Sequence, residues 1–226
     1  MAKFAKKIHE NNEILLIKKF IRLFKYKLRD YKKRRFSFVL TGGDSPIKLY
    51  KYLARDKKIN WKKIDFFIGD ERFVKESSKN SNIGMCKKYL LNKIKISKNQ
   101  IYNISTEKFS IKECAADYEN KIKKYFSGKN IKFDLMLLGI GNDGHIASLF
   151  RNVINKKNNK NIQLVKKKDF LRISMTLKCI NNSKNIFLWA PGKKKSSIIK
   201  KILLDNNYKY PASFLKKENN YLFHCN

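Results

Sequence analysis

Apolar positions along the chain follow two periodicities, and these predict alternating strands and helices. Apolar residues recur at helical spacing in five segments, which predicts helices over 14–28, 47–53, 84–91, 111–126 and 192–204. Short continuous apolar runs predict buried strands over 35–40, 64–68, 133–138, 170–177, 185–190 and 221–224. The order of these segments, strand after helix, sets the class of fold.

Strands that alternate with helices are typical of an α/β protein. We therefore predict a doubly wound, mostly parallel sheet with helices on both faces, in a Rossmann-like arrangement. The chain shows no internal repeat and no convincing linker, so we expect one domain over 1–226. The polar, lysine-rich stretch 152–168 is interpreted as a poorly ordered surface loop.

The charge of the chain is extreme, with 53 Lys and Arg against 18 Asp and Glu and a net charge of +35. Such a balance is typical of proteins that bind nucleic acid or acidic membranes. Lysine is spread along the sequence, however, and arginine, which is the better fork for phosphates and base edges, is the rarer cation. Lys, Asn and Ile are all overused, which favours the base composition of the genome as the cause of the high positive charge. We expect no specific nucleic-acid partner.

The cysteines indicate a reducing compartment. Cys86, Cys114, Cys179 and Cys225 are scattered and form no C-x-x-C pair, so we expect buried, reduced thiols and a cytoplasmic protein. No apolar stretch is long enough to span a bilayer, and no secretory signal is visible. The basic, amphipathic segment 14–28 is interpreted as a packing helix and not as a membrane-surface helix.

The stretch 133–150 carries the strongest functional signal. An apolar strand runs into a turn broken by glycines that presents Asp143 and His145. Such turns lie at the carboxyl edge of an α/β sheet, where ligands bind. An apolar periodicity resumes directly afterwards and predicts a helix, whose dipole would keep His145 neutral and able to act as a general base. The structural alternative is a helix start that Asp143 caps.

Three further stretches are predicted at the same edge. Glycines in 41–46 follow a strand and precede a helix, which favours anion binding by backbone N–H groups. Arg72 lies in the charged run 69–72, which follows the strand 64–68, and its guanidinium could bind a phosphate. The alternative interpretation of this run is a plain solvated loop. Lys195 lies in a lysine run at a predicted helix start, within reach of a phosphate. Each signal is weak alone.

In this order, the stretches resemble the family of sugar-phosphate enzymes that contains 6-phosphogluconolactonases and glucosamine-6-phosphate deaminases. The resemblance covers nearly the whole chain. Its most specific part is the Gly-x-Asp-Gly-His-Thr-Ala-Ser-Leu-Phe-Pro signature, matched by 141–150. The other matching stretches lie at 41–46, 70–72, 81–82, 192–195, 211–212 and Arg172.

Two differences favour the lactonase branch. The deaminases continue their signature with Gly-Phe-Asn-Glu-Pro, where this chain has 147–150, and they carry a tyrosine where Arg72 stands. Three residues depart from the family pattern: Asp44 replaces a small hydroxyl residue, Ile146 a threonine and Arg151 a proline. A carboxylate at Asp44 conflicts with a phosphate cradle unless its side chain points away.

The resemblance implies hydrolysis of 6-phospho-D-glucono-1,5-lactone in the oxidative pentose phosphate pathway. It implies His145 as the general base that activates water, with Asp143 in support. It further implies a sugar phosphate bound by Gly42, Gly43, Ser45, Arg72, Arg172 and Lys195. The lactone is an activated ester, so we expect neither a metal nor a cofactor. We further expect a monomer or weak dimer.

Three alternatives stay open on the sequence. One is a deaminase-type enzyme of the same family. A second is a basic nucleic-acid-binding protein, which would need clustered arginines and stacking aromatics on one face. The third is an inactive remnant of the fold, for which Asp44 is the sole sequence support.

Overall fold

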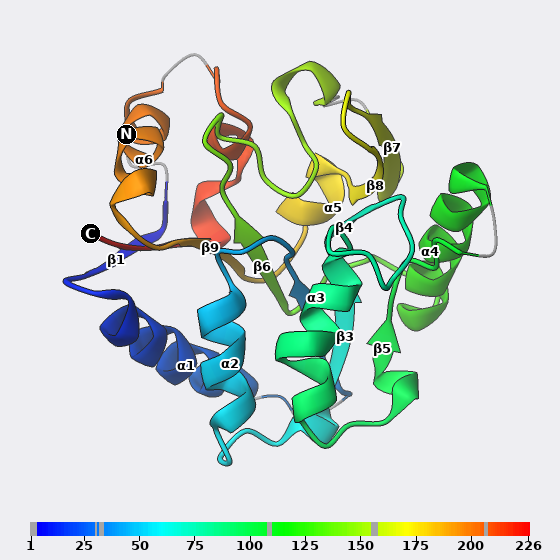
Figure 1. The fold of residues 1–226 in the computed structure, drawn as a ribbon, viewed down its shortest axis with the longest axis horizontal. Coiled ribbons are helices and arrows are strands. Elements are labelled where there is room, and N and C mark those ends of the chain that lie inside the picture. The colour runs from blue at the N-terminus through cyan, green and yellow to red at the C-terminus, as the bar shows by residue number, and fades with distance from the viewer. Residues whose placement is uncertain (1–3, 30, 32–33, 108–109, 155–157, 206–207) are drawn as a thin grey trace.

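A computed structural model describes residues 4–29, 31, 34–107, 110–154, 158–205 and 208–226. Its main feature is a seven-stranded sheet in which every pairing is parallel (Figure 1). The strands, in spatial order, are β1 (Lys6–Glu10), β10 (Asn220–Cys225), β9 (Ile186–Ala190), β6 (Leu135–Gly139), β2 (Phe36–Leu40), β3 (Ile64–Ile68) and β5 (Ile101–Tyr102). The predicted doubly wound fold is confirmed.

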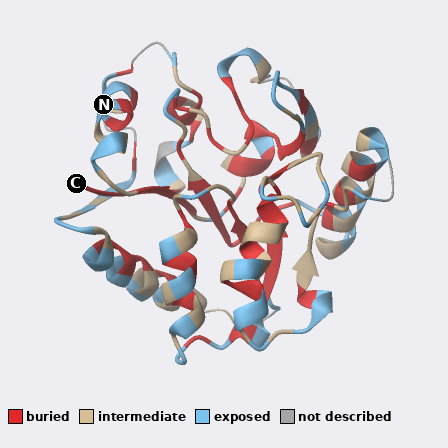
Figure 2. Ribbon diagram, viewed as in Figure 1, coloured by how far each residue is buried: buried red, intermediate tan, exposed pale blue. Residues whose placement is uncertain are grey.

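Helices cover both faces of this sheet. On one face lie α1 (Glu13–Arg29), α2 (Ile47–Arg55) and α3 (Asn82–Tyr89). On the other lie α4 (Ile111–Tyr125), α5 (Leu177–Asn181) and α6 (Ser196–Leu204). Short 3₁₀ turns occur at Trp61–Lys63, Leu91–Lys93, Lys98–Gln100, Arg151–Val153, Lys193–Lys195, Pro211–Phe214 and Lys217–Asn219. The buried residues therefore fall into two cores, one on each side of the sheet (Figure 2).

Alternate residues of a central strand enter different cores. In β6, Leu135 and Leu137 pack with α1–α3, whereas Met136 and Leu138 pack on the opposite face. Because both faces are covered, the strand is a continuous apolar run and not an alternating one. The sequence pattern predicted this strand well for that reason.

The structure contains a second sheet that the sequence did not predict. It is antiparallel, with the order β4 (Asp70–Arg72), β8 (Leu171–Met175) and β7 (Ile162–Lys166). The prediction of a loop over 152–168 is therefore wrong at β7, although 155–157 lie outside the described residues. Strand β7 was missed because only Ile162 and Val165 are buried, and Gln163 and Lys166 break the apolar run.

Several smaller elements also differ from the predictions. The edge strand β1, the short strand β5 and the helix α5 were not predicted. Helix α3 begins two residues earlier than expected because the Ser81 hydroxyl caps it by accepting from the Gly84 amide. Helix α6 starts at Ser196, after a 3₁₀ turn that contains Lys195.

The order of the strands places a ligand-binding edge between β2 and β6. From β2 the chain proceeds outward through β3 and β5, and then returns to β6 on the other side of β2. The loops at the carboxyl ends of β2 and β6 leave this switch point in opposite directions, which opens a crevice there. The glycine loop 41–46 and the turn 140–145 are these two loops.

Two predictions from composition can be compared with the described residues. The four cysteines are free and buried, as expected. None of the helices in the described part of the chain has the length and apolar character needed to cross a bilayer.

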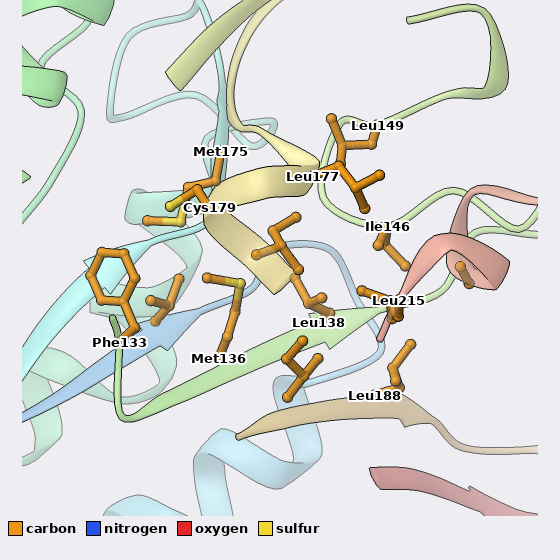
Figure 3. Close-up of a cluster of buried hydrophobic side chains, with 14 of the residues drawn as sticks. Phe133, Met136, Leu138, Ile146, Leu149, Met175, Leu177, Cys179, Leu188 and Leu215 are labelled. Carbon is orange, nitrogen blue, oxygen red and sulfur yellow. The ribbon is translucent and has the colours of Figure 1, made fainter. Parts of the chain in front are cut away.

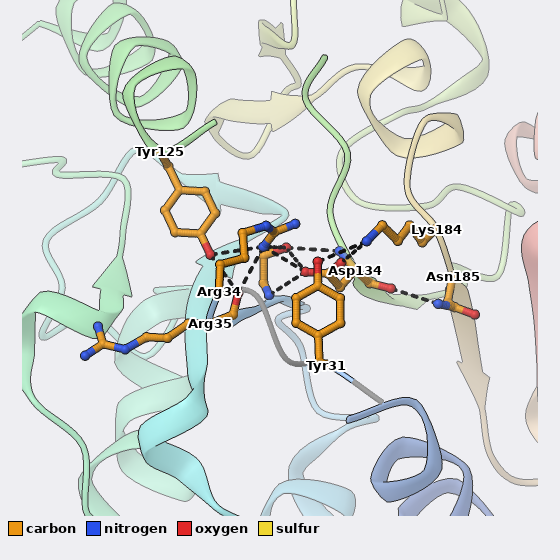
Figure 4. A network of polar contacts seen from close by, with 8 residues as sticks. Tyr31, Arg34, Arg35, Tyr125, Asp134, Lys184 and Asn185 are labelled. Carbon is orange, nitrogen blue, oxygen red and sulfur yellow. Dashed lines mark hydrogen bonds and ion pairs between the residues drawn. The ribbon is translucent and has the colours of Figure 1, made fainter. Parts of the chain in front are cut away.

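A polar network lies at the opposite, amino-terminal edge of the same two strands (Figure 4). Asp134 is 1% exposed and precedes β6 directly. Its carboxylate accepts from the backbone amide and the hydroxyl of Ser37 in β2, at 2.9 and 2.8 Å. Arg34 and Lys184 form ion pairs with it at 2.9 and 2.8 Å. The network fastens β2 to β6 far from the crevice.

We predict that Asp134→Ala lowers the free energy of unfolding by at least about 2 kcal/mol, because two buried Ser37 donors lose their acceptor. Chemical denaturation measures this loss. The control is Asp65→Ala on the neighbouring strand. Burial raises the pKa of Asp65 despite its partners Tyr125 and Arg35, so removal of that carboxylate should change stability by less than about 1 kcal/mol. Equal losses for the two variants would contradict the role given to Asp134.

Candidate active site

A cleft of about 140 Å³ opens at the predicted edge of the sheet. It is bounded by the loops after β2 and β6 and by the small antiparallel sheet. Of the site residues predicted from the sequence, those that line it are Gly42, Gly43, Ser45, Arg72, His145 and Arg172. Residues distant in sequence therefore converge on one site, as the strand order requires.

His145 and Asp143 form a hydrogen-bonded pair at one side of the cleft. The distance from His145 Nδ1 to Asp143 Oδ1 is 2.5 Å, and the same oxygen accepts from the His145 backbone amide at 3.2 Å. Partial burial raises the pKa of Asp143, but the bonds from His145 outweigh this effect and hold that pKa below its usual value. The carboxylate accepts only, so Nδ1 carries a hydrogen and Nε2 of the neutral ring is the basic nitrogen.

The helix predicted directly after His145 does not exist. Residues 146–150 form a tight turn in which Leu149 donates to the Ile146 carbonyl at 2.9 Å. Gly144 and Ala147 have φ of +78° and +48°, in the left-handed region that an α-helix excludes. The helix-dipole explanation for a neutral His145 and the capping role of Asp143 are therefore both wrong. The tautomer is fixed by Asp143 instead.

The turn is held in place by apolar residues on its inner side. Figure 3 shows Ile146 and Leu149 directed into the core that contains Leu138 of β6 and Leu177 of α5. Ile146 is fully buried and Leu149 is 1% exposed. Their spacing, together with Phe150, imitates a helical pattern, which explains the error in the sequence prediction. These residues anchor the turn.

Gly141 lets the His145 ring lie against the backbone. A Cβ at position 141 would stand 2.0 Å from His145 Nδ1 and 2.7 Å from Asp143 Oδ1. The Gly141 amide donates to the His145 carbonyl at 2.8 Å and closes the turn. On its other side, the His145 ring contacts Phe150, with 4.6 Å between centroids. The imidazole is thus fixed on several sides.

Two arginines lie next to each other on neighbouring strands of the small sheet. Arg72 of β4 and Arg172 of β8 are register partners, and both line the cleft. Arg72 Nη1 donates to the Asn80 carbonyl at 2.8 Å, and Arg172 Nη2 pairs with Asp169 at 2.5 Å. Their Nε atoms are buried without a hydrogen-bond partner. Paired guanidiniums with unused donors fit a doubly charged oxyanion such as phosphate.

The glycine loop brings backbone groups to the cleft and keeps Asp44 out of it. Trp189 Nε1 donates to the Ser45 carbonyl at 3.0 Å and fixes the loop against the core. Asp44 is exposed and borders a separate surface hollow, together with Ile47 and Met85. Asp44 is not among the residues that line the cleft, so its carboxylate does not conflict with an anion bound there.

Lys195 is not among the residues that line the cleft. Its ammonium donates to the Ile140 carbonyl at 2.8 Å and to Asn142 Oδ1 at 2.9 Å. Burial lowers the pKa of Lys195, against an opposing effect of Asp143. The structure thus places Lys195 as a brace of the turn that carries Asp143 and His145.

Sequence reasoning gave no role to two polar residues of the cleft, Asp70 and Asn82. The Asp70 carboxylate is 6% exposed and accepts from the Ser148 hydroxyl at 2.6 Å. Asn82 is 2% exposed and donates to the Asp70 carbonyl at 2.7 Å. Both residues belong to stretches that match the family, and that was the one available signal. Among the described residues, no cluster of three His, Cys, Asp or Glu could hold a metal ion.

Comparison with known proteins identifies the family. The profile described as glucosamine-6-phosphate isomerases/6-phosphogluconolactonase matches residues 12–223. The chain belongs to this family. It is 35% identical to the 6-phosphogluconolactonase of Haemophilus influenzae over 80% of this chain and 79% of that protein. Identity to the Synechocystis enzyme of the same name is 31%, over 80% and 78%.

A solved structure of the family supports the same architecture. The crystal structure of 6-phosphogluconolactonase from Thermotoga maritima superposes with a TM-score of 0.85 at 26% identity, covering 98% of this chain and 100% of that one. The family resemblance inferred from the motifs is thereby confirmed.

We predict that inorganic phosphate binds the cleft and that Arg72→Ala and Arg172→Ala each weaken its affinity by about 10- to 100-fold, the range expected for charged hydrogen bonds. Isothermal titration calorimetry measures the affinity. Arg55→Ala at the exposed end of α2 removes the same charge away from the cleft and should leave the affinity nearly unchanged. A uniform weakening in all three variants would indicate a nonspecific effect of net charge.

Proposed function

We propose that this chain is a 6-phosphogluconolactonase, which hydrolyses 6-phospho-D-glucono-1,5-lactone to 6-phosphogluconate in the pentose phosphate pathway. The names of its relatives support this activity. The observation that carries the proposal is that one cleft is lined by His145, which is hydrogen-bonded to Asp143, and by two arginines. A base and an anion clamp in one cleft suit a substrate with an electrophilic carbon and a phosphate.

In this proposal, the two arginines bind the 6-phosphate. That remote contact holds the carbonyl carbon of the lactone near His145, and a fixed geometry of this kind replaces a random encounter. Asp70 lies in the same cleft with a carboxylate that accepts hydrogen bonds, and it suits the hydroxyl groups of the sugar. The substrate is therefore held at both its charged and its neutral parts.

The chemical step is general-base hydrolysis. Nε2 of His145 takes a proton from water while the water oxygen attacks the lactone carbonyl carbon. The tetrahedral intermediate then collapses, the bond to the ring oxygen breaks, and the imidazolium returns its proton to that oxygen. Asp143 stabilises the imidazolium through Nδ1. We assign the developing oxyanion to the backbone N–H groups of Gly42 and Gly43.

The bracing contacts of Lys195 change the role that the resemblance implied for it. Its ammonium supports the turn by donating to the Ile140 carbonyl and to Asn142, so we give it a supporting role in place of a direct phosphate contact. The buried thiols support a reducing compartment and hence a cytoplasmic enzyme.

The direct test is an assay of the purified protein on freshly prepared 6-phosphogluconolactone, with spontaneous hydrolysis subtracted. Glucosamine 6-phosphate serves as the parallel substrate. We expect lactone hydrolysis well above the spontaneous rate and no release of ammonia. Ammonia release without lactone hydrolysis would reassign the chain to the deaminase activity, and neither reaction would indicate an inactive member of the family.

His145→Gln should reduce kcat by about 10²- to 10⁴-fold, the usual contribution of a positioned general base. The affinity for inorganic phosphate, measured by calorimetry, should stay at the wild-type value, because the arginines lie on other strands. A variant that hydrolyses the lactone at a near-normal rate would disprove the role of His145.

Gly141→Ala should reduce kcat by about 10²-fold, because the added methyl group displaces the imidazole and small displacements have effects of this size. The matched control is Gly128→Ala, at a positive φ with open space around it. That variant should lose some thermal stability and keep kcat. If both variants retain full turnover, the tight contact of the ring with Gly141 does not matter for catalysis.

A further inference from the structure

Glu71 is a buried carboxylate for which the proposed reaction has no use. It is 1% exposed and lies between Asp70 and Arg72 in β4. Its register partner in β8 is Ile173, which is buried in the core. Glu71 is absent from the lining of the cleft, although both of its chain neighbours line it. A buried charge destabilises the fold unless hydrogen-bond donors or opposite charges around it compensate for the lost hydration.

The surroundings of Glu71 consist of hydrogen-bond donors. Oε1 accepts from the backbone amides of Arg72 and Asn82, at 2.8 and 2.7 Å. Oε2 accepts from the Ile83 amide at 2.8 Å and from the Ser81 hydroxyl at 3.2 Å. Two of these amides belong to the first turn of α3, where the helix dipole favours a negative charge. A strand residue thus caps a helix that begins eleven residues later in the chain.

This cap connects two residues of the cleft. Arg72 is adjacent to Glu71, and its guanidinium is held by the carbonyl of Asn80 in the segment that leads into α3. Asn82 begins α3, and its side chain lies so close to Gly42 that a Cβ there would stand 1.8 Å from Asn82 Oδ1. The orientation of Arg72 and the seating of the glycine loop therefore both depend on where α3 begins.

The charges near Glu71 act in opposite directions. Burial raises its pKa to about 7, with a smaller contribution from Asp70, while the amides of Ile83, Asn82 and Arg72 oppose the increase. Burial, and after it the charge of Glu71, raise the pKa of the Cys86 thiol on α3. The three backbone amides can only donate, so they favour the ionised form of Glu71, against the effect of burial.

We propose that Glu71 is the positioning residue of the anion site: it fastens the start of α3 to β4 and thereby fixes Arg72 and Asn82 in the cleft. This inference rests on the proposed function only in its kinetic part. The binding of inorganic phosphate tests it whether or not the protein hydrolyses the lactone.

The test is Glu71→Gln, which keeps the size of the side chain but turns an NH₂ group toward donors. We expect the KM for the lactone and the dissociation constant for inorganic phosphate to rise together by about ten-fold, with kcat within about two-fold of wild type, because His145 and Asp143 lie on a different loop. The matched control is Glu113→Gln, which alters a carboxylate that caps α4 away from the cleft. It should change neither constant.

A double-mutant cycle separates positioning from plain stabilisation. In an Arg72→Ala background, Glu71→Gln should weaken phosphate binding by less than about three-fold, because the residue through which it acts is gone. Should Glu71→Gln fail to fold, Ser81→Ala removes one donor to Glu71 together with the hydroxyl that caps α3, and it should raise the phosphate dissociation constant by about two- to five-fold. Wild-type phosphate affinity in the folded Glu71→Gln protein, with a lowered melting temperature alone, would overturn the proposal. Full additivity in the cycle would overturn it as well.

Discussion

The site depends on the burial of a short turn that has no regular secondary structure. Residues 146–150 are held because Ile146 and Leu149 are buried in the core beside β6 and α5 (Figure 3). Burial of such side chains contributes about 1.5–3 kcal/mol each. With this anchor the polar part of the turn, from Gly141 to His145, is presented at the cleft in one conformation. A strained backbone at Ala147 persists because the packing around it fixes the chain.

The order of the strands brings the glycine loop and the two arginines to the same edge as His145. Because β2 and β6 are neighbours at the switch point, the glycine loop and the Asp143–His145 turn face each other. Strand β3 continues past Gly69 into β4, which leaves the main sheet and pairs with β8. This change of partner sets Arg72 opposite Arg172. The groups that we propose for catalysis and for anion binding thus come from two sheets and meet at one edge.

The main sheet could be predicted from the sequence because its central strands are buried on both faces. The run Leu135–Leu138 has no polar interruption and Phe36–Leu40 has only Ser37, so the apolar pattern suffices. Of the small sheet, only β8 was predicted, as the strand over 170–177. Strand β7 has only two buried residues and is interrupted by Gln163, and β4 consists of three charged residues whose burial cannot be seen without their partners. His145, Arg72 and the glycine loop were found through motifs, and their mutual proximity follows from the strand order.

The roles that we assign to Glu71, Asp70 and Lys195 could be inferred only from the structure. A carboxylate in a charged run is solvated in most sequences, and only the amides of α3 show why Glu71 is buried. Lys195 was predicted to contact phosphate because it follows a strand. In the structure its ammonium donates to the Ile140 carbonyl and to the Asn142 side chain. The false helix after His145 arose because three apolar residues at spacings of three and four are compatible with either a helix or a buried turn.

In the reaction that we propose, the carboxylate of Asp143 has a consequence for the release of the product. The lactone enters uncharged at its reacting carbon, whereas the ring-opened acid carries a new negative charge at the same position. That charge arises close to an ionised Asp143, whose low pKa keeps it ionised near neutral pH. Like charges repel, so the pair that favours attack on a neutral ester also disfavours retention of the anion it produces. Departure of the acid is thereby assisted electrostatically, without any movement of a domain.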